Sequence, residues 1–187
     1  MRRVLIVGSG GAGKSTVAVL LGARLQLPVI HLDAHYWHPG WVATPRDEWH
    51  AQVAELVERD AWVMDGNYGG TMEQRLAACD TVVLLDLPRV VCLWRIVRRA
   101  IRYAGRSRPD MTPGCAETLS WAFVWWVLSY PSRRRPDVLR RLAALPETTR
   151  VVRLRSSREV AAFVAHAYAR PRIIRPHPSP NAQNEDD

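Results

Sequence analysis

Residues 3–16 of this 187-residue chain read RVLIVGSGGAGKST: an apolar run, a glycine-rich turn, a lysine and two hydroxyl residues. The turn fits the pattern G-x-x-x-x-G-K-[ST], whose backbone N–H groups surround phosphate oxygens. The apolar run predicts a buried strand, and residues 16–25 (TVAVLLGARL) predict a helix. This context is the one that the pattern requires for nucleotide binding. We assign the nucleotide to Gly8, Ser9, Gly10, Gly11, Ala12, Gly13, Lys14, Ser15 and Thr16.

Lys14 is the only lysine in the chain, because every other residue in the Lys+Arg total of 26 is arginine. A compact ammonium reaches the β- and γ-phosphates inside a narrow loop, whereas a planar guanidinium is too wide. The Ser15 hydroxyl that follows is suited to bind Mg²⁺. The sequence therefore predicts ATP and Mg²⁺ as cofactors.

Composition predicts one domain with a sizeable core. The three cysteines (Cys79, Cys92 and Cys115) lack C-x-x-C spacing, so we expect neither a disulfide framework nor a zinc site, and a cytoplasmic protein. The longest apolar stretch, residues 121–130, is too short to span a bilayer, and the chain starts with a strand instead of a signal peptide. The net charge of +8 has two open explanations: anionic partners such as nucleic acid, or arginines on solvated faces.

Strand and helix patterns alternate along the chain. Further strands are expected at residues 29–33, 61–65, 81–86 and 151–154. Helices are expected at residues 45–59 (with Thr44 as N-cap), 88–103, 117–130, 136–145 and 157–168. The alternation predicts a three-layer α/β fold with a five-stranded parallel sheet and ligands at the carboxyl ends of its strands. We expect one domain over residues 1–169, with a lid at about 104–116, and a disordered tail at 170–187.

Acidic residues stand where three predicted strands end. Asp65, in residues 65–68 (DGNY), is expected to hold Mg²⁺ through water or to orient the nucleophile; the alternative is a cap on the next turn. Asp33 is expected to act as a base toward an acceptor hydroxyl or to anchor the acceptor; the alternative is a helix N-cap. Asp86 precedes Leu-Pro and is expected to fix the turn into the next helix.

Further acceptor contacts are assigned to residues near these acids. Asn67 and Tyr68 follow Asp65 and are candidates for touching the acceptor. Trp37 and Trp41 either stack on a ring of the acceptor or pack in the core or lid. His31, His35 and His38 stand close together, but a strand-to-loop segment offers no clear ligand geometry, so no metal site is predicted there.

Arginines cluster on both sides of the predicted lid. Four of them follow i, i+3, i+4, i+7 spacing and predict one positive helix face: Arg95, Arg98, Arg99 and Arg102. Others lie at positions 106 and 108, and at 133–135. Phosphoryl transfer needs cations that close over the γ-phosphoryl and exclude water. We assign catalytic roles to Arg95, Arg99, Arg106 and Arg134, besides Lys14, Asp33 and Asp65, and we assign Arg155 to the nucleotide.

These motifs resemble the adenylate-kinase-like branch of P-loop kinases and, more narrowly, the proteins named DNA topology modulation (FlaR-type) proteins. The resemblance covers most of the chain up to about residue 165 and rests on residues 8–15, 32–41, 65–68, 85–88, 106–111 and 130–131. It implies a P-loop NTPase fold with an acceptor-binding segment and a helical lid insertion. Nucleotide kinases carry Asp-Gly-Phe-Pro-Arg where this chain has Asp65-Gly66-Asn67-Tyr68. The arginine that grips the acceptor's phosphate in those kinases is therefore missing here.

Two functions follow as hypotheses. The first is an ATP–Mg²⁺-dependent phosphotransferase, or kinase, acting on a small-molecule or nucleotide-like acceptor. The second is a nucleotide-dependent regulatory NTPase that binds nucleic acid through its arginine-rich helix. Arginines that converge on the cleft would favour the first, and arginines spread over an outer face the second. We expect a monomer or homodimer, with Trp121, Trp125 and Trp126 in the core in preference to a dimer face.

Overall fold

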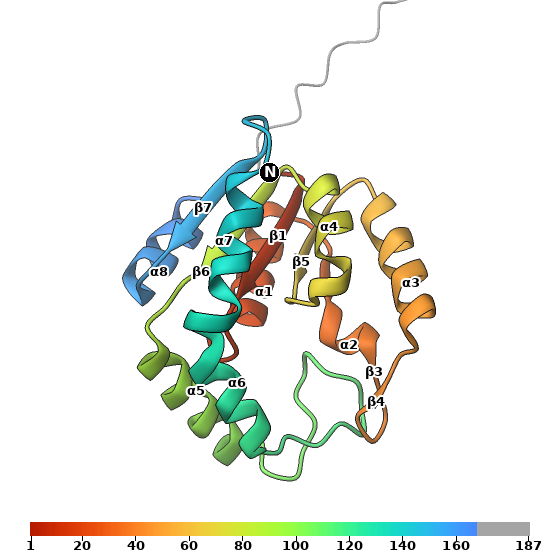
Figure 1. Cartoon of the computed structure of the whole chain (residues 1–187), viewed down its shortest axis with the longest axis vertical. Coiled ribbons are helices and arrows are strands. Elements are labelled where there is room, and N and C mark those ends of the chain that lie inside the picture. The colour runs from red at the N-terminus through yellow and green to blue at the C-terminus, as the bar shows by residue number, and fades with distance from the viewer. Residues whose placement is uncertain (168–187) are drawn as a thin grey trace, which may run out of the picture.

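A computed structural model describes residues 1–167 of the chain. Its centre is a five-stranded parallel sheet in the order β2-β5-β1-β6-β7, with helices on both faces (Figure 1). The strands are β1 (Arg3–Gly8), β2 (Val29–His31), β5 (Trp62–Asp65), β6 (Thr81–Leu85) and β7 (Arg150–Leu154). The predicted three-layer α/β fold is confirmed. The predicted tail at 170–187 lies outside the described residues.

Helices connect successive strands. They are α1 (Lys14–Leu25), α2 (Leu32–Tyr36), α3 (Arg46–Glu58), α4 (Met72–Ala78), α5 (Arg89–Arg102), α6 (Trp121–Arg133), α7 (Arg135–Ala143) and α8 (Ser157–Ala165). A 3₁₀ turn (η1, Gly69–Thr71) precedes α4, and a small hairpin joins β3 (Trp37–His38) to β4 (Val42–Ala43). None of the helices within residues 1–167 combines the length and apolar character needed to cross a membrane.

Two apolar clusters hold the layers together. One joins the sheet to α1 and α8 and to the inner sides of α5 and α6, and the other joins it to α3, α4 and α7. The central strands are buried on both faces; Val4, Leu5, Ile6 and Val7 are 0% exposed. Continuous apolar runs suit such strands because neither side of the sheet meets water. The core thus fixes the strand ends at which the predicted site residues lie.

Some boundaries differ from the expectation. The second strand ends at His31, and Asp33 lies in the short helix α2. Thr44 does not cap α3; its hydroxyl donates to the Tyr36 carbonyl (2.7 Å), and Pro45 is the N-cap residue. α6 begins at Trp121 and not at residue 117, because Ser120 accepts a hydrogen bond from the Phe123 N–H and caps the helix.

The tryptophans of α6 also differ from the expectation. Trp121 is 78% exposed and Trp125 57% exposed, so these two do not lie in the core. α6 buries Val127 and Tyr130 instead, and at 100° per residue Trp121 and Trp125 fall on the opposite side. Trp126 is half-buried and stacks on Phe123, with ring centroids 6.1 Å apart.

The segment expected to form a lid, residues 104–116, runs between α5 and α6. It contains turns and bridges, and helices lie only on either side of it. The segment lies against α2 and the β3–β4 hairpin (Figure 1). Thr112 Oγ1 donates to the Ala34 carbonyl (2.9 Å), Gly40 N to the Gly114 carbonyl (3.1 Å) and Trp41 Nε1 to the Ala116 carbonyl (3.0 Å). The segment is therefore docked on the part of the chain that carries Asp33.

Candidate functional site

The glycine loop after β1 has the geometry of an anion-binding turn. Gly11 and Gly13 have φ values of 74° and 94°, and a Cβ on Gly11 would lie 2.3 Å from the Cys92 carbonyl oxygen. Lys14 Nζ donates to the carbonyls of Gly8 and Ser9, at 3.1 Å each. α1 begins at Lys14, so the N–H groups of its first turn face the loop. The loop, the ammonium and the helix end together have the geometry and the charge that suit phosphate groups.

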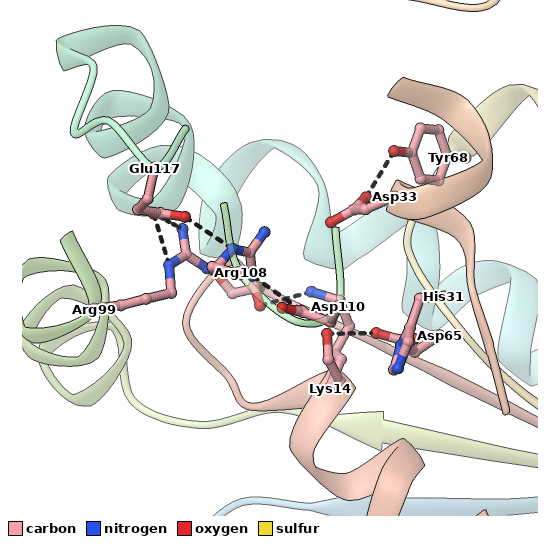
Figure 2. Close-up of polar contacts among 11 residues, drawn as sticks. Lys14, His31, Asp33, Asp65, Tyr68, Arg99, Arg108, Asp110 and Glu117 are labelled. Carbon is pink, nitrogen blue, oxygen red and sulfur yellow. Dashed lines mark hydrogen bonds and ion pairs between the residues drawn. The ribbon is translucent and has the colours of Figure 1, made fainter. Parts of the chain in front are cut away.

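Asp65 connects the glycine loop to the edge of the sheet. Ser15 Oγ donates to Asp65 Oδ2 (2.9 Å), and His31 Nδ1 lies 2.5 Å from Asp65 Oδ1 (Figure 2). The parallel register pairs His31 with Asp65 at the ends of β2 and β5. The hydrogen bond to Asp65 raises the pKa of His31, although burial opposes this shift. His31 is thus a partner of Asp65, which the sequence alone did not predict.

The donors around Asp65 fit a magnesium ion. The Ser15 hydroxyl and the Asp65 carboxylate are hard oxygen ligands on adjacent elements, and Mg²⁺ usually combines few protein ligands with waters and substrate phosphates. Within residues 1–167 no group of three or more His, Cys, Asp or Glu side chains could hold a metal without such help. The residues present therefore suit a nucleotide-bound Mg²⁺ better than a permanent metal centre.

Asp33 lies on α2, just after the end of β2. The Tyr68 hydroxyl donates to Asp33 Oδ1 (2.6 Å) (Figure 2). Burial and the charge of Asp33 raise the pKa of Tyr68, so its hydroxyl stays protonated and remains a donor. Burial lowers the pKa of Lys14, while the charges of Asp33 and Asp65 oppose that shift. Both carboxylates are thus close enough to Lys14 to act on its ammonium.

The aromatic residues of this region mostly contact one another. Trp37 packs edge-on against Tyr36 (4.9 Å between centroids) and Trp41 (5.5 Å). Trp41 is 37% exposed, and its indole N–H holds the lid at Ala116. Tyr68 packs on Tyr36 and on Trp49 as well as bonding Asp33. These contacts tie Trp41 to the segment 104–116, and they make the surroundings of Tyr68 and Asp33 aromatic.

Asn67, expected at the acceptor, is bonded to the glycine loop instead. Its Nδ2 donates to the Gly8 carbonyl (2.7 Å), and Gly8 N donates to its Oδ1 (3.1 Å). Both ends of the amide are used at the first residue of the loop, because β1 and β5 are neighbours in the sheet. Asn67 therefore holds the loop to the segment that follows Asp65.

Arg75 on α4 supports the same segment and was missed in the sequence. Its side chain is fully buried and donates to four carbonyls: Gly66 (2.9 Å), Asn67 (2.7 Å), Tyr68 (2.7 Å) and Thr71 (3.2 Å). Burial lowers its pKa to about 10, which leaves the guanidinium charged at neutral pH. Arg75 is thus a structural cation that shapes the turn after Asp65, and it is not available to a ligand.

Arg75→Met is expected to lower the free energy of unfolding by about 3 kcal/mol, because buried carbonyls without donors cost roughly 1–3 kcal/mol each and partial solvation will recover some of this. Urea denaturation would measure the loss. Arg158→Met, on an exposed arginine of α8, is the matched control and should change stability by less than about 0.5 kcal/mol. Equal stabilities of the two variants would contradict the role given to Arg75.

Two arginines, Arg99 and Arg108, form ion pairs with the buried Glu117, which directly follows the segment 104–116. Glu117 has 3% of its side chain exposed; Arg99 Nη2 lies 2.8 Å from its Oε1, and Arg108 Nε 2.8 Å from its Oε2. Arg108 Nη1 also pairs with Asp110 (3.0 Å), as Figure 2 shows. Burial and the neighbouring Arg108 lower the pKa of Arg99, while Glu117 opposes this. The pairing ties α5 to both ends of the lid.

Glu117→Gln is expected to loosen the lid, because the neutral amide no longer balances two guanidinium groups. Trypsin should then cut after the exposed Arg106 about 10-fold faster, which corresponds to ~1.4 kcal/mol of local stability. Mass spectrometry of the fragments would follow this bond. The control is Glu147→Gln, an exposed glutamate away from the lid. An unchanged cleavage rate at Arg106 would show that the ion pairs do not restrain the lid.

The remaining predicted arginines are dispersed. Arg95 donates to the Ala12 carbonyl (3.1 Å) and to Ser157 Oγ (3.0 Å), beside a cavity of about 570 Å³ that Gly13 and Thr16 also line. Arg106 and Arg134 are exposed, with no side-chain contact recorded within residues 1–167. Arg155 lines a separate cavity near Asp86. Asp86 bonds Arg135 (2.8 Å) and Arg153 (2.6 Å).

The four arginines of α5 lie on one side of the helix, as their spacing predicted, but they differ in burial. Arg95 and Arg99 face inward, whereas Arg98 and Arg102 are exposed. The exposed pair lies over aromatic rings: Arg98 lies 5.3 Å from the Trp94 ring centroid and Arg102 5.6 Å from that of Tyr103. The four positions spread over about 100° of the helix circumference, so one edge of the positive side faces inward and the other faces solvent.

Comparison with models of known protein families found no match, and neither did comparison with curated proteins. Solved structures do match. The shikimate kinase of Acinetobacter baumannii, solved with shikimate, gives a TM-score of 0.54 at 19% identity over 88% of this chain and 89% of that one. Shikimate kinases of Bacteroides thetaiotaomicron and Aquifex aeolicus both give 0.53, at 15% and 18% identity, over 88% and 87% of this chain and 94% and 92% of theirs. The chain therefore has the α/β fold of the P-loop kinases.

Proposed function

We propose that the protein is an ATP–Mg²⁺-dependent phosphotransferase that acts on a small hydroxyl compound. One observation carries the proposal: the charges of Asp33 and Asp65 both act on Lys14 beside the glycine loop, and Thr112 of the segment 104–116 bonds Ala34, next to Asp33. Such a set of one cation and two carboxylates beside a phosphate-binding loop suits in-line phosphoryl transfer. The match in fold to shikimate kinases supports the same reaction class.

Each residue has a defined task in this proposal. The loop N–H groups and Lys14 bind the β- and γ-phosphates, and Ser15 and Asp65 hold Mg²⁺, which neutralises phosphate charge when it is bound. Asp33 takes the proton of the acceptor hydroxyl as its oxygen forms a bond to the γ-phosphorus. The bond from that phosphorus to the β,γ-bridging oxygen breaks, and ADP leaves. Arg99 stabilises the charge on the transferring group from the lid side.

The base of the nucleotide is proposed to lie in the cavity beside Arg95. This cavity adjoins Gly13 and Thr16 at the start of α1, where the α-phosphate side of a bound nucleotide would emerge. The Arg95 guanidinium offers a planar cation for stacking on a base. Arg95 would then bind the base, whereas Arg99, one turn further along the same helix, serves the phosphates.

The acceptor is proposed to carry a hydroxyl group but no phosphate of its own. The arginines of this region within residues 1–167 are already assigned: Arg75 bonds carbonyls, Arg108 pairs with Glu117 and Asp110, and Arg99 is given to the transferring phosphoryl group. An acceptor phosphate would need a bidentate arginine that this site does not offer. The aromatic wall of Tyr36, Trp37 and Tyr68 favours a ring, and the hydrogen-bonded Asp33 favours its hydroxyl.

A coupled ADP-release assay tests this function. The panel would contain cyclic polyols, hydroxylated ring acids such as shikimate, nucleosides and nucleoside monophosphates. We expect a hydroxyl compound without phosphate to raise ADP release at least about 10-fold above slow hydrolysis, and nucleoside monophosphates to raise it least. Failure of every acceptor would refute the phosphotransferase. Selective turnover of a nucleoside monophosphate would refute the proposed class of acceptor, but it would still support phosphoryl transfer as the reaction.

The finer family assignment is part of the proposal. The resemblance to DNA topology modulation proteins and to the adenylate-kinase-like branch rests on sequence motifs, including residues 37–41 (WHPGW) and 108–111 (RPDM). A cytoplasmic location is supported by three buried and unpaired cysteines: Cys79, Cys92 and Cys115. These points do not depend on which acceptor is used.

A second function, nucleic-acid binding, is favoured by the exposed Arg98 and Arg102 and the net charge of +8. It predicts binding of duplex DNA that weakens steeply with salt and responds to ATP. A fluorescence-anisotropy titration at two salt concentrations would test it, with Arg98→Gln/Arg102→Gln as the variant. Absent or salt-insensitive binding would remove this function.

A further inference from the structure

A second cavity, of about 720 Å³, lies on the other side of the first turn of α5. Its walls come from the ends of β6 and β7, the start of α5 and the region where α6 meets α7. It shares no lining residue with the cavity beside Arg95, and it touches the glycine loop only at Ser9. Its volume falls in the range that holds small-molecule ligands. The phosphotransferase proposed above makes no use of it.

Positive charge exceeds negative charge around this cavity. Four arginines line it, namely Arg89, Arg135, Arg153 and Arg155, against a single acidic residue, Asp86. Arg135 and Arg153 share the Asp86 carboxylate, which holds both guanidinium groups in place. Arg89 and Arg155 have no ion pair within residues 1–167. The cavity thus combines a fixed pair of cations with two that are free to close on an anion.

One of these arginines stands where helix stability disfavours it. Arg89 is the first residue of α5, whose first turn has no acidic residue, whereas α7 begins at Arg135 and has Asp137 in its first turn. A helix N-terminus carries partial positive charge, so a cation there is unfavourable by a few tenths to ~1 kcal/mol. An anion bound between the two helix ends would reverse that effect.

An unpartnered hydroxyl also lines the cavity. Tyr130 on α6 is 3% exposed, and its hydroxyl has no hydrogen-bond partner among the residues that the structure describes. Burial raises the pKa of Tyr130, so the hydroxyl is a proton donor at neutral pH. A buried hydroxyl without a partner costs about 1–3 kcal/mol. A ligand oxygen would supply the missing acceptor.

Apart from Ser9, the rest of the lining is apolar. Leu87, Val90, Val127 and Pro131 surround the polar groups, so a bare inorganic ion would leave most of the cavity without contacts. We propose that this cavity is a second binding site, separate from the nucleotide site, for a phosphorylated small molecule with a ring. Its phosphate lies among Arg89, Arg135 and Arg155 and accepts a hydrogen bond from Tyr130, and its ring packs on the apolar residues.

Phenyl phosphate is a suitable probe because it combines these two features. Isothermal titration would be run on the full chain with a saturating non-hydrolysable ATP analogue and Mg²⁺, so that the glycine loop is filled. We expect one equivalent to bind with a Kd of roughly 10–500 µM, inorganic phosphate to bind at least about 3-fold more weakly, and phenol not to bind. Arg89→Gln/Arg155→Gln should weaken phenyl phosphate binding at least about 10-fold, and Tyr130→Phe about 3-fold.

Arg158→Gln is the control, since this exposed arginine lies close in sequence but outside the cavity. It should bind phenyl phosphate as the wild type does. Two results would overturn the proposal: no binding once the ATP analogue is bound, which would assign the phosphate to the glycine loop, or equal binding by the Arg89→Gln/Arg155→Gln variant. Because the titration involves no turnover, its result is independent of whether the phosphotransferase activity is found.

Discussion

Lys14→Ala should lower ATP turnover by about 10³-fold or more, or ~4 kcal/mol of transition-state stabilisation. The Lys14 ammonium donates to the Gly8 and Ser9 carbonyls of the glycine loop. From there it can stabilise the negative charge that develops on the β- and γ-phosphates during transfer. Lys14→Arg should be nearly as inactive although it keeps the charge, because the planar guanidinium does not fit the loop. ADP release with the best acceptor would measure both variants.

The control for these variants is Arg158→Ala, which removes an exposed cation far from the loop and should leave turnover unchanged. Thermal unfolding should show that both Lys14 variants remain folded, since the side chain bonds only two loop carbonyls. A Lys14→Arg variant with more than about a tenth of wild-type turnover would contradict the geometric argument. It would mean that charge alone suffices at this position.

Amine-selective labelling tests independently whether Lys14 lies at the nucleotide site. As the only lysine, Lys14 shares amine reactivity with the N-terminus alone, and burial lowers its pKa, which increases the fraction of reactive neutral amine. ATP with Mg²⁺ should protect Lys14 and leave the N-terminus unaffected. Unchanged labelling of Lys14 in saturating ATP would count against the nucleotide site, whatever the acceptor.

The parts of the fold that follow from local sequence were predictable. The run of Val4 to Val7 predicts its own structure, because a strand buried on both faces needs an unbroken apolar run. The glycines in residues 8–15 do so as well, because a phosphate-binding loop needs backbone N–H groups that side chains do not obstruct. Parallel strands then bring their carboxyl ends to one edge. Asp33, Asp65 and the loop could therefore be placed near one another from sequence alone.

The supporting residues could not be predicted, because their partners are chosen by tertiary packing. Arg75 lies on a helix of only seven residues, which is too short to show a clear hydrophobic periodicity. Its partners are backbone carbonyls, which every residue has, so the sequence does not reveal them. Glu117 was expected in a helix, yet it is the buried partner of Arg99 and Arg108. His31 gains its role only through the register of β2 with β5. Each case depends on a contact between separate elements.

The division between Arg95 and Arg99 has a simple geometric origin. The two residues are one helical turn apart, which is about 6 Å along the axis, and both face inward. Because of this spacing, Arg95 contacts the Ala12 carbonyl in the glycine loop, whereas Arg99 pairs with Glu117. One helix thus places two arginines in different surroundings, and the spacing in the sequence does not tell which arginine has which partner.

Asp33→Asn should lower acceptor-dependent turnover by about 10²–10³-fold while leaving the affinity for ATP within about 3-fold of the wild type. The amide has the shape of the carboxylate but cannot take the acceptor's proton. Tyr68→Phe, which removes the 2.6 Å hydrogen bond to Asp33 and keeps the aromatic ring, should cost about 10-fold because Asp33 is then less well oriented. ADP release and titration with a fluorescent ATP analogue would separate the two effects.

Asp60→Asn, at an exposed acid away from the cleft, is the control for the change of charge. The pattern across variants distinguishes the two halves of the site: Lys14→Ala should weaken every reaction of ATP, slow hydrolysis included, whereas Asp33→Asn should spare hydrolysis and remove the acceptor's effect. If Asp33→Asn instead weakened ATP binding as much as Lys14→Ala, Asp33 would belong to the nucleotide site. The acceptor would then have to be sought elsewhere along the sheet edge, with His31 and Asp110 as the nearest polar groups.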